Sequence, residues 1–334
     1  MSLLKHLPSY FKGSLMALGL TLAGNQAQAA PPPPLQTQAP GYQRLAVGEY
    51  EVTALFDGYS DLGPTLLKGL SQKDIRAMLE RKFIFTPGMP TAFNAFLINT
   101  GKNLVLVDAG AGACFGGTAG WLPDNIRAAG YQPEQVDTVL LTHMHVDHVC
   151  GLINTKDEPV FANATVYAAK PEADYWLSQE NLDKAPKDAR GFFEVARKSV
   201  APYVAVHRFK TFTPEQSLVP GVTAVSMPGH TPGSSGYTFS SNGQSILFMG
   251  DLVHSFAVQF QHPEVSIGFD VQGKQAVVTR EKLFKQVAHD RTWVAGAHLP
   301  FPGIGHISGR EKAFAWVPVE YGPYQRPKNV PLIQ

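Results

Sequence analysis

The seven-residue segment Thr142–His148 contains three histidines and one aspartate. The apolar segment Asp137–Leu141 precedes it and predicts a buried strand, so these polar residues begin where a strand ends. Residues two apart on an extended backbone point to the same side, so His143 and His145 can bind one metal ion. The pair Asp147–His148 follows as the chain turns and can reach a second metal. Imidazole and carboxylate ligands suit zinc and similar divalent ions, whereas the alternative is a histidine-rich surface loop.

Three further residues of the same chemical types follow apolar segments later in the chain. His230 lies in a Gly-His-Thr-Pro-Gly turn, where glycine lets the backbone approach a metal closely. Asp251 follows a glycine and can bridge two cations with its two oxygens, and His298 ends another apolar segment. The strands predicted before them are Val222–Met227, Ser245–Met249 and Trp293–Ala297. Each residue alone is more often an ordinary polar group near a turn, but together they indicate a dinuclear metal site.

Several motifs in this order resemble one known family. They are Val107–Gly110, Ala129–Asp137, His143–His148, Trp176–Gln179, Gly229–Thr231, Gly250–Asp251 and Ala297–His306. The chain resembles the metallo-β-lactamase superfamily and, within it, the methyl parathion hydrolase group, from about Gly41 to about Tyr321. The resemblance implies an α/β fold of one domain, a four-layer αβ/βα sandwich with the metal site at one edge. Layered packing also fits the strands predicted at Phe93–Ile98 and Leu104–Val107 and the amphipathic helices predicted near Pro123–Ala129 and Lys274–Ala288.

The resemblance also implies a role for each candidate ligand. One metal would be held by His143, His145 and His230, the other by Asp147, His148 and His298, with Asp251 bridging the two. Asp108 matches a carboxylate that orients a ligand histidine. On local sequence alone, Asp108 could equally be a turn or helix-capping residue. The expected cofactors are two divalent ions, zinc first, with manganese, cobalt or iron as alternatives.

The ligand set predicts hydrolytic chemistry. Two cations about 3.5–4 Å apart can share a hydroxide that forms near pH 7, which then serves as the nucleophile. Asp147 and Asp251 are the catalytic candidates, because Asp251 sets the metal spacing and Asp147 can accept a hydrogen bond from the hydroxide. Zinc β-lactamases typically carry cysteine or serine at the position of Asp251, which argues against β-lactam hydrolysis.

The substrate pocket is expected from the resemblance to contain aromatic residues. Phe115, Trp176 and Phe192 match a cluster around the leaving group, although local sequence would assign each to core packing. His254 stands three residues after Asp251, where the related enzymes tend to be apolar. One hypothesis is that His254 narrows the leaving-group pocket, so that His254→Leu raises activity on bulky aryl phosphotriesters. The alternative is a partly exposed histidine without a role.

The N-terminus predicts an exported protein. Basic residues precede the apolar stretch Gly13–Gly24, and Ala27–Ala29 fits a cleavage site. The stretch falls short of the roughly 20 apolar residues that a membrane span needs. We therefore expect a signal peptide at 1–29, a proline-rich lead-in at 30–41, the hydrolase domain at 42–321 and a C-terminal tail at 322–334. The expected location is the periplasm or the exterior of the cell.

Charge and cysteine content limit the partners. With 28 basic and 27 acidic side chains and no basic stripe, we expect no nucleic-acid partner, and no membrane partner once the signal is cleaved. The family suggests a homodimer. The chain has two cysteines, Cys114 and Cys150. An oxidising compartment permits a bond between them, but we expect Cys150 to be a small buried thiol and the two to remain unpaired.

These observations predict a dinuclear-metal hydrolase. The expected substrates are organophosphate triesters such as methyl parathion or paraoxon, and also aryl esters or lactones. An alternative is a native lactonase or arylesterase with only promiscuous phosphotriesterase activity. A different class, a non-catalytic metal-binding periplasmic protein, is disfavoured because structural zinc sites usually have four protein ligands per metal and include cysteine. Seven ligands for two metals leave positions open for water.

Overall fold

The computed structural model describes residues 32–85, 87–213, 216–310 and 313–324. The predicted signal peptide at 1–29 lies outside these residues, as does most of the predicted tail at 322–334. Residues 32–40 are exposed and form neither helix nor strand. Internal contacts separate residues 1–38 from residues 39–334, and the elements described below belong to the second unit. No helix in the described part of the chain is long and apolar enough to cross a membrane.

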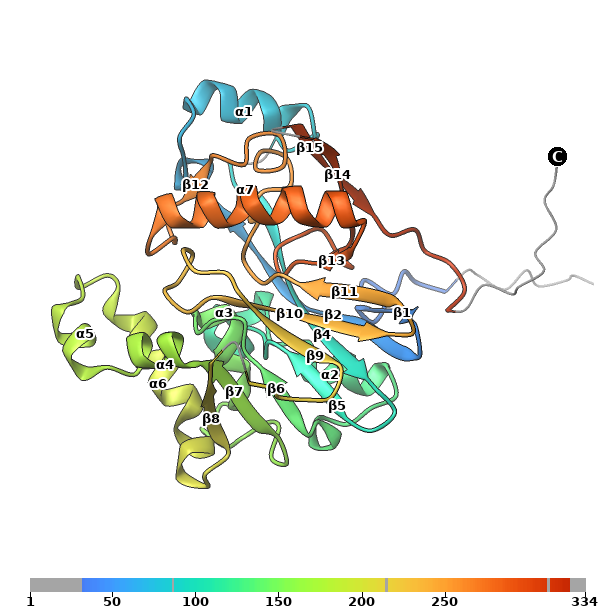
Figure 1. Cartoon of the computed structure of the whole chain (residues 1–334), viewed down its shortest axis with the longest axis vertical. Helices are drawn as coiled ribbons and strands as arrows, with labels where there is room; N and C mark the ends of the chain where they lie inside the picture. Colours follow the sequence, from blue (N-terminus) through green and yellow to red (C-terminus); the bar gives the residue numbers. More distant parts are fainter. Residues whose placement is uncertain (1–31, 86, 214–215, 311–312, 325–334) are drawn as a thin grey trace, which may run out of the picture. The chain divides into compact units, whose positions relative to one another are not determined.

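Two large sheets form the centre of the fold (Figure 1). The first has the order β1-β2-β4-β5-β6-β7-β8: β1 Tyr42–Val47, β2 Tyr50–Leu62, β4 Met89–Asn99, β5 Leu104–Val107, β6 Thr138–Leu140, β7 Thr165–Ala169 and β8 Phe209–Phe212. The second has the order β15-β14-β13-β11-β10-β9: β9 Val222–Ser226, β10 Ser235–Ser241, β11 Gln244–Phe248, β13 Trp293–Ala295, β14 Ile304–Arg310 and β15 Ala313–Pro318. The short strands β3 (Leu67–Lys68) and β12 (Ser266–Ile267) pair with each other.

The helices lie between these strands in the chain. They are α1 Gln72–Glu80, α2 Leu122–Ala128, α3 Val146–Val149, α4 Lys170–Trp176, α5 Gln179–Lys184, α6 Arg190–Ala205 and α7 Gly273–Asp290. Short 3-10 turns occur at η1 Pro64–Leu66, η2 Gly112–Thr118, η3 Pro133–Gln135 and η4 Cys150–Leu152. The two predicted amphipathic helices are confirmed as α2 and α7, and the predicted strands before the candidate metal ligands are confirmed as β6, β9, β11 and β13.

Three layers of buried side chains show how the elements stack. Between the sheets, Phe96 of β4 packs against Phe248 of β11, with ring centroids 5.1 Å apart. The outer face of the first sheet is covered by α2 and α6, and the outer face of the second by α7, whose Phe284 is buried with Leu247. Helices therefore cover both outer faces of the paired sheets. The predicted four-layer αβ/βα sandwich is confirmed.

The expectation of two unpaired cysteines is wrong. Cys114 and Cys150 form a disulfide, with their Cα atoms 6.3 Å apart, inside the range that a disulfide can bridge. The reason is close backbone packing between η2 and η4. A Cβ placed on Gly112 would meet Cα of Gly151 at 2.9 Å, so only glycines allow this approach. The 36 residues that separate the cysteines along the chain conceal this proximity.

Candidate metal centre

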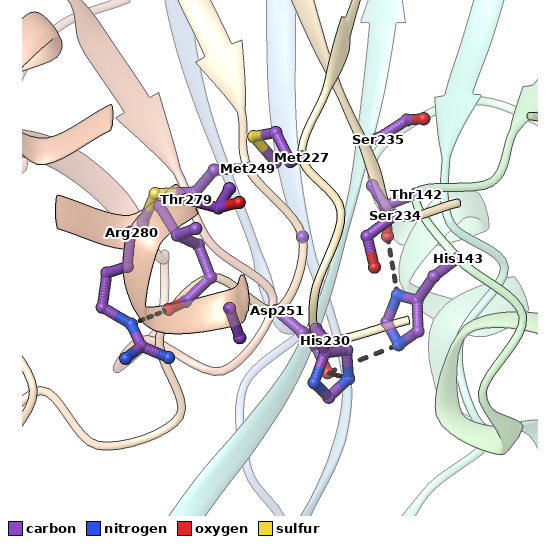
Figure 2. Close-up of a pocket in the computed structure, with 13 residues that line it drawn as sticks. Thr142, His143, Met227, His230, Ser234, Ser235, Met249, Asp251, Thr279 and Arg280 are labelled. Carbon is purple, nitrogen blue, oxygen red and sulfur yellow. Dashed lines mark hydrogen bonds and ion pairs between the residues drawn. The ribbon is translucent and has the colours of Figure 1, made fainter. Parts of the chain in front are cut away.

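Four side chains from three loops form a first group of candidate ligands. His143 and His145 leave the end of β6, His230 follows β9 and Asp251 follows β11. Their potential ligand atoms all lie within 4.8 Å of one another. Nδ1 of His145 is 2.9 Å from Nε2 of His230, which is 3.2 Å from Oδ2 of Asp251. Figure 2 shows His143, His230 and Asp251 approaching one another from different loops.

A second group shares Asp251 with the first. Asp147 and His148 lie on α3, the single helical turn that begins directly after His145, and His298 follows β13. Nε2 of His298 is 2.9 Å from Oδ2 of Asp251 and 3.3 Å from Oδ2 of Asp147. Nε2 of His148 is 3.1 Å from Oδ1 of Asp251. The structure thus brings all seven predicted ligands together, with Asp251 common to both groups.

Unsatisfied buried atoms show that this cluster fits cations. Nε2 of His143, Nε2 of His148 and Oδ1 of Asp251 are buried and have no hydrogen-bond partner. Buried polar atoms are normally paired, so three in one cluster need an explanation. Lone pairs of imidazole and carboxylate groups that converge at these distances suit divalent metals such as zinc, manganese, cobalt or iron. The residues therefore fit two divalent ions.

The pKa values of the cluster follow from burial and mutual contact. Burial lowers the pKa of His143 and His145 well below the ordinary histidine value, and neighbouring histidines add to this effect. Burial alone would raise the pKa of Asp251, but nearby histidines, His148 first, hold it well below the ordinary aspartate value. Burial would also lower the pKa of His148, yet Asp251 and Asp108 raise it well above the ordinary value.

Similarity to known proteins identifies the family. The model for the metallo-beta-lactamase superfamily matches residues 89–298, which is more than half of the chain. The chain belongs to the metallo-beta-lactamase superfamily. All seven candidate ligands lie inside the matched segment, and His298 is its last residue.

Two solved structures and one curated sequence are similar to this chain. A crystal structure described as hydrolase AbOPH in the beta lactamase superfamily is 41% identical, has a TM-score of 0.83, and is matched over 86% of this chain and 100% of its own. AidC, a dizinc quorum-quenching lactonase in complex with a product, is 25% identical with a TM-score of 0.78, over 85% and 99% of the two chains. A probable metallo-hydrolase of Mycobacterium tuberculosis is 27% identical over 184 residues, which are 49% of this chain and 57% of that protein.

Asp108 contacts one of the candidate ligand histidines, as expected of the carboxylate that the resemblance implied. Its Oδ2 lies 2.9 Å from Nδ1 of His148 and accepts a hydrogen bond from the Thr142 hydroxyl. Its Oδ1 accepts from the Thr142 backbone N–H. One carboxylate therefore fixes both the ring of a candidate ligand and the start of the loop that carries four of them. Asp108 also stands in the turn directly after β5, with a φ of 61°, and it caps none of the described helices.

The sequence analysis did not predict two carboxylates that hold the candidate ligand histidines and their loops in place. Asp270 places Oδ1 2.9 Å from Nδ1 of His230 and accepts the Ile267 backbone N–H at Oδ2. Asp270 follows His230 by 40 residues, and no recognisable motif surrounds it. Glu172, on α4, is the second, and burial raises its pKa while four hydrogen bonds oppose that rise. Only a long-range contact connects either residue with the metal centre.

Glu172 joins the two loops that carry the histidines of the first group. Its Oε1 accepts hydrogen bonds from the Met144 N–H and from Nε1 of Trp176. Its Oε2 accepts from the Thr231 hydroxyl and the Gly233 N–H. Met144 lies between two candidate ligands and Thr231 follows a third, so this buried carboxylate fixes the position of both loops.

A cavity of about 270 Å³ lies against the metal centre. Its apolar lining consists of Leu62, Phe93, Phe115, Val146, Phe192 and Phe269, and its polar lining of His145, Asp147, His230, Asp251, His254 and His298. Phe115, Phe192 and His254 are among the pocket residues that the sequence predicts. Five of the seven candidate ligands line this cavity: Asp251 and four others. A molecule bound in the cavity would therefore contact the candidate metal site.

Trp176 does not line this cavity, which corrects the sequence prediction. The indole is buried, donates a hydrogen bond from Nε1 to Glu172, and packs edge-on against the His145 ring with centroids 5.2 Å apart. It borders a neighbouring cavity together with Phe192. The reason is that the indole packs between the rings of His145 and Phe193, whose centroids are 5.2 Å and 4.6 Å away. Trp176 therefore supports a candidate ligand.

His254 is buried, so the alternative of a partly exposed histidine is wrong. The residue is 4% exposed, and its Nε2 lies 3.2 Å from Oδ2 of Asp251. Its ring stacks on that of His298, with centroids 4.9 Å apart and an interplanar angle of 28°. Nδ1 of His254 is buried without a hydrogen-bond partner. The ring thus occupies one side of the cavity directly beside the shared aspartate.

A second, much smaller cavity lies behind Asp251. Its volume of about 10 Å³ is close to that of one water molecule, too small for a substrate. Figure 2 shows Arg280 of α7 on one side of it and His143 on the other. Arg280 donates from Nε to the Leu252 carbonyl and from Nη1 to the carbonyls of Pro263 and Val265. These bonds hold the segment that carries His254.

Proposed function

We propose that this protein is a dinuclear metal-dependent hydrolase that cleaves uncharged esters: organophosphate triesters, aryl esters and lactones. The observation that carries the proposal is that two groups of ligands share Asp251 and border an apolar cavity. A structural metal site would be closed by protein ligands and would not face a cavity of substrate size.

The proposed roles follow the geometry of the two groups. His143, His145 and His230 would hold one metal, Asp147, His148 and His298 the other, and Asp251 both. When bound, two such ions would supply a Lewis acid for the substrate oxygen and lower the pKa of water toward neutrality. Asp251 sets the distance between the two groups, and Asp147, the most exposed of the seven, reaches the cavity where it can orient a water molecule by hydrogen bonding.

The charge of the cavity limits the substrates. Among the described residues that line it, none is lysine or arginine, and six of the twelve are apolar. A substrate that carries its own negative charge would find no lysine or arginine to pair with there. Uncharged substrates with an apolar or aryl group would instead bury that group against Phe93, Phe115 and Phe192. This favours triesters, aryl esters and lactones over phosphate monoesters and the carboxylates of β-lactams.

Lactone hydrolysis is the second candidate for the native activity. AidC is a lactonase and covers 85% of this chain, and N-acyl homoserine lactonases of Bacillus thuringiensis match 49% of it at 22% identity. The polar ring of His254 beside Asp251 narrows the space for the leaving group. We infer that lactones fit this space better than bulky aryl phosphotriesters, whose hydrolysis would then be promiscuous.

Export is part of the proposal. The signal peptide predicted at 1–29 directs the chain out of the cytosol, and the disulfide between Cys114 and Cys150 supports an oxidising compartment. Cell fractionation with an antibody against the protein tests this directly. Recovery of full-length chain from the cytosol alone would contradict it.

The decisive experiment measures metals and rates on the same preparation. Elemental analysis of the purified protein should find two divalent ions per chain. The rates kcat/KM should be measurable for dihydrocoumarin, 4-nitrophenyl acetate, paraoxon and methyl parathion, and far lower for 4-nitrophenyl phosphate and a β-lactam. Asp251→Asn should lose both metal and turnover, whereas Asp290→Asn, at the exposed end of α7, should lose neither. A protein that holds two metals yet hydrolyses none of the uncharged esters would overturn the proposal.

A further inference from the structure

One aromatic residue of the cavity lining, Phe115, lies on an exposed loop. Phe115 lies in η2, and most residues of this turn are exposed. Its ring packs edge-on against Phe93, with centroids 4.9 Å apart, and Phe93 in turn is 5.7 Å from the ring of His298. A Cβ added to Gly116 or Gly117 would meet no atom within 4 Å. These two glycines therefore add no packing, and the ring of Phe115 is held by its contacts with the cluster of Phe93, Ala111 and Ala119. The Thr118 hydroxyl donates a hydrogen bond to the Phe115 carbonyl.

The two ends of this loop are well anchored. The carboxylate of Asp57 is buried and accepts hydrogen bonds from the backbone N–H groups of Ala111 and Leu122. These bonds fix the positions where the chain enters and leaves the loop. They do not reach its middle, where Phe115 stands. Cys114, the residue next to Phe115, supplies the cross-link there.

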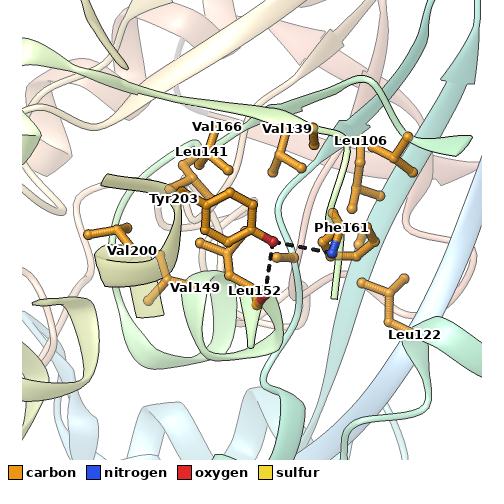
Figure 3. Close-up of a cluster of buried hydrophobic side chains, with 14 of the residues drawn as sticks. Leu106, Leu122, Val139, Leu141, Val149, Leu152, Phe161, Val166, Val200 and Tyr203 are labelled. Carbon is orange, nitrogen blue, oxygen red and sulfur yellow. Dashed lines mark hydrogen bonds between the residues drawn. The ribbon is translucent and has the colours of Figure 1, made fainter. Parts of the chain in front are cut away.

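The other end of the cross-link, Cys150, is buried next to the hydrophobic core. Cys150 directly follows α3, the turn that carries Asp147 and His148. Its neighbours Val149 and Leu152 are fully buried, and Figure 3 shows both in the core around Tyr203. The Tyr203 hydroxyl donates to the Leu152 carbonyl and accepts the N–H of Phe161.

We propose that the Cys114–Cys150 disulfide is a positioning element for substrate binding. It joins the exposed loop bearing Phe115 to the rigid segment bearing two candidate metal ligands, and so fixes the distance between the aromatic wall and the metal centre. It acts on the binding of the apolar part of the substrate through Phe115. This inference rests on the proposed function only in assigning the 270 Å³ cavity to the substrate.

Loss of the cross-link should change substrate binding more than chemistry. With the loop free, Phe115 samples positions away from Phe93, and part of its contact with the substrate is lost. We expect Cys114→Ser combined with Cys150→Ser to raise KM for dihydrocoumarin and paraoxon about fivefold, with kcat changed less than about twofold. A purely structural disulfide would lower the melting temperature but leave KM unchanged below the unfolding transition.

A double-mutant cycle distinguishes a disulfide that positions Phe115 from one that only stabilises the fold. Phe115→Ala alone should raise KM, and adding it to the disulfide-free protein should raise KM little further, because both changes remove the same contact. Phe192→Ala is the matched control, since Phe192 lines the same cavity from α6, which the disulfide does not tether. Its effect should add to that of disulfide removal. Additive effects for both phenylalanines would overturn the proposal.

A second readout does not depend on catalysis. Hydrogen exchange of the backbone amides at 112–118 should become about tenfold faster in the disulfide-free variant, while that of 190–205 stays unchanged. Unchanged exchange at 112–118 would also overturn the proposal. If the wild-type protein hydrolyses none of the esters, the proposed function fails while this measurement still decides the role of the disulfide.

Two controls protect the interpretation. Both cysteines are replaced together, because a single replacement would leave a free Cys150 thiol two residues from His148, and metal content is measured for each variant. If the double variant does not fold, the folded wild-type protein is treated with tris(2-carboxyethyl)phosphine. Each phosphine takes one oxygen from water to become its oxide while the disulfide gains two electrons and two protons to give two thiols. The same KM and exchange outcomes then apply.

Discussion

At the scale of single residues, the candidate metal centre contains and is supported by buried carboxylates that each have several polar partners. Asp251 belongs to both ligand groups, Asp108 fixes both a ligand ring and a loop, and Glu172 accepts four hydrogen bonds. A buried carboxylate is stable only when such partners replace its hydration. Changing one of these residues therefore leaves several buried partners unsatisfied, which makes the consequences large and measurable.

Glu172→Gln should destabilise the protein and weaken metal binding. Glutamine keeps one acceptor oxygen, and its NH₂ group would face at least one N–H donor that cannot accept, so at least one of the four hydrogen bonds is lost. We expect the free energy of unfolding to fall by about 2–4 kcal/mol and metal affinity by about 10-fold or more. Denaturant unfolding and metal titration measure these effects. Glu180→Gln, on the exposed surface of α5, is the control and should change neither.

His254→Leu should favour bulky substrates. The change replaces a polar ring, held against Asp251 and stacked on His298, by an apolar and more flexible side chain. We expect kcat/KM for bulky aryl phosphotriesters to rise roughly tenfold, because removing one polar or steric obstruction in a pocket has effects of this order. Rates for 4-nitrophenyl acetate, which is small, serve as the internal comparison. Equal kcat/KM values for both proteins across the series would count against the hypothesis.

At the scale of elements, the loop ends of β6, β9, β11 and β13 deliver the seven candidate ligands. The loop after β11 is long and has little regular structure, yet most of its residues are buried between Met249 and Val258. Its backbone carbonyls need partners, and Arg280 of α7 supplies three hydrogen bonds. Helix α7 therefore does more than cover the second sheet, because it holds the segment that carries Asp251 and His254.

Arg280→Lys should loosen this loop. A lysine has a single nitrogen and cannot bond to three carbonyls at the separate positions that the guanidinium reaches. The Val265 carbonyl keeps its hydrogen bond from Gln259, but the lysine would leave at least one of the carbonyls of Leu252 and Pro263 without a partner. We expect a loss of about 1–3 kcal/mol in the free energy of unfolding. Lys285→Met, at an exposed position of the same helix, is the matched control and should change stability by less than about 0.5 kcal/mol. Equal stabilities of the two variants would contradict this role for Arg280.

At the scale of the whole fold, the metal centre joins the two sheets. His143, His145, Asp147 and His148 follow a strand of the first sheet, whereas His230, Asp251 and His298 follow strands of the second. Metal ions bound by both groups would link the two halves of the sandwich. Metal binding should therefore contribute to the stability of the entire domain, because ions that bind the folded state alone stabilise it by mass action.

Removal of metal should lower the melting temperature of the whole domain. Dialysis against a chelator should lower it by about 5 °C or more, and adding zinc back should restore it. Calorimetry measures the shift. Asp251→Asn, which lacks the shared ligand, should show little response to the chelator. An unchanged melting temperature in the metal-depleted wild-type protein would show that the centre does not stabilise the fold.

The sequence alone determined the ligand types, their order and their positions at strand ends, because these depend on local spacing and on apolar segments that precede each ligand. The resemblance to the metallo-β-lactamase superfamily implied the four-layer fold and the shared role of Asp251. Only the tertiary structure revealed the disulfide, the contacts of Glu172 and Asp270, and the burial of Trp176 behind His145. Each of these depends on how distant segments pack, and packing across tens of residues leaves no periodic or local pattern from which it could be predicted.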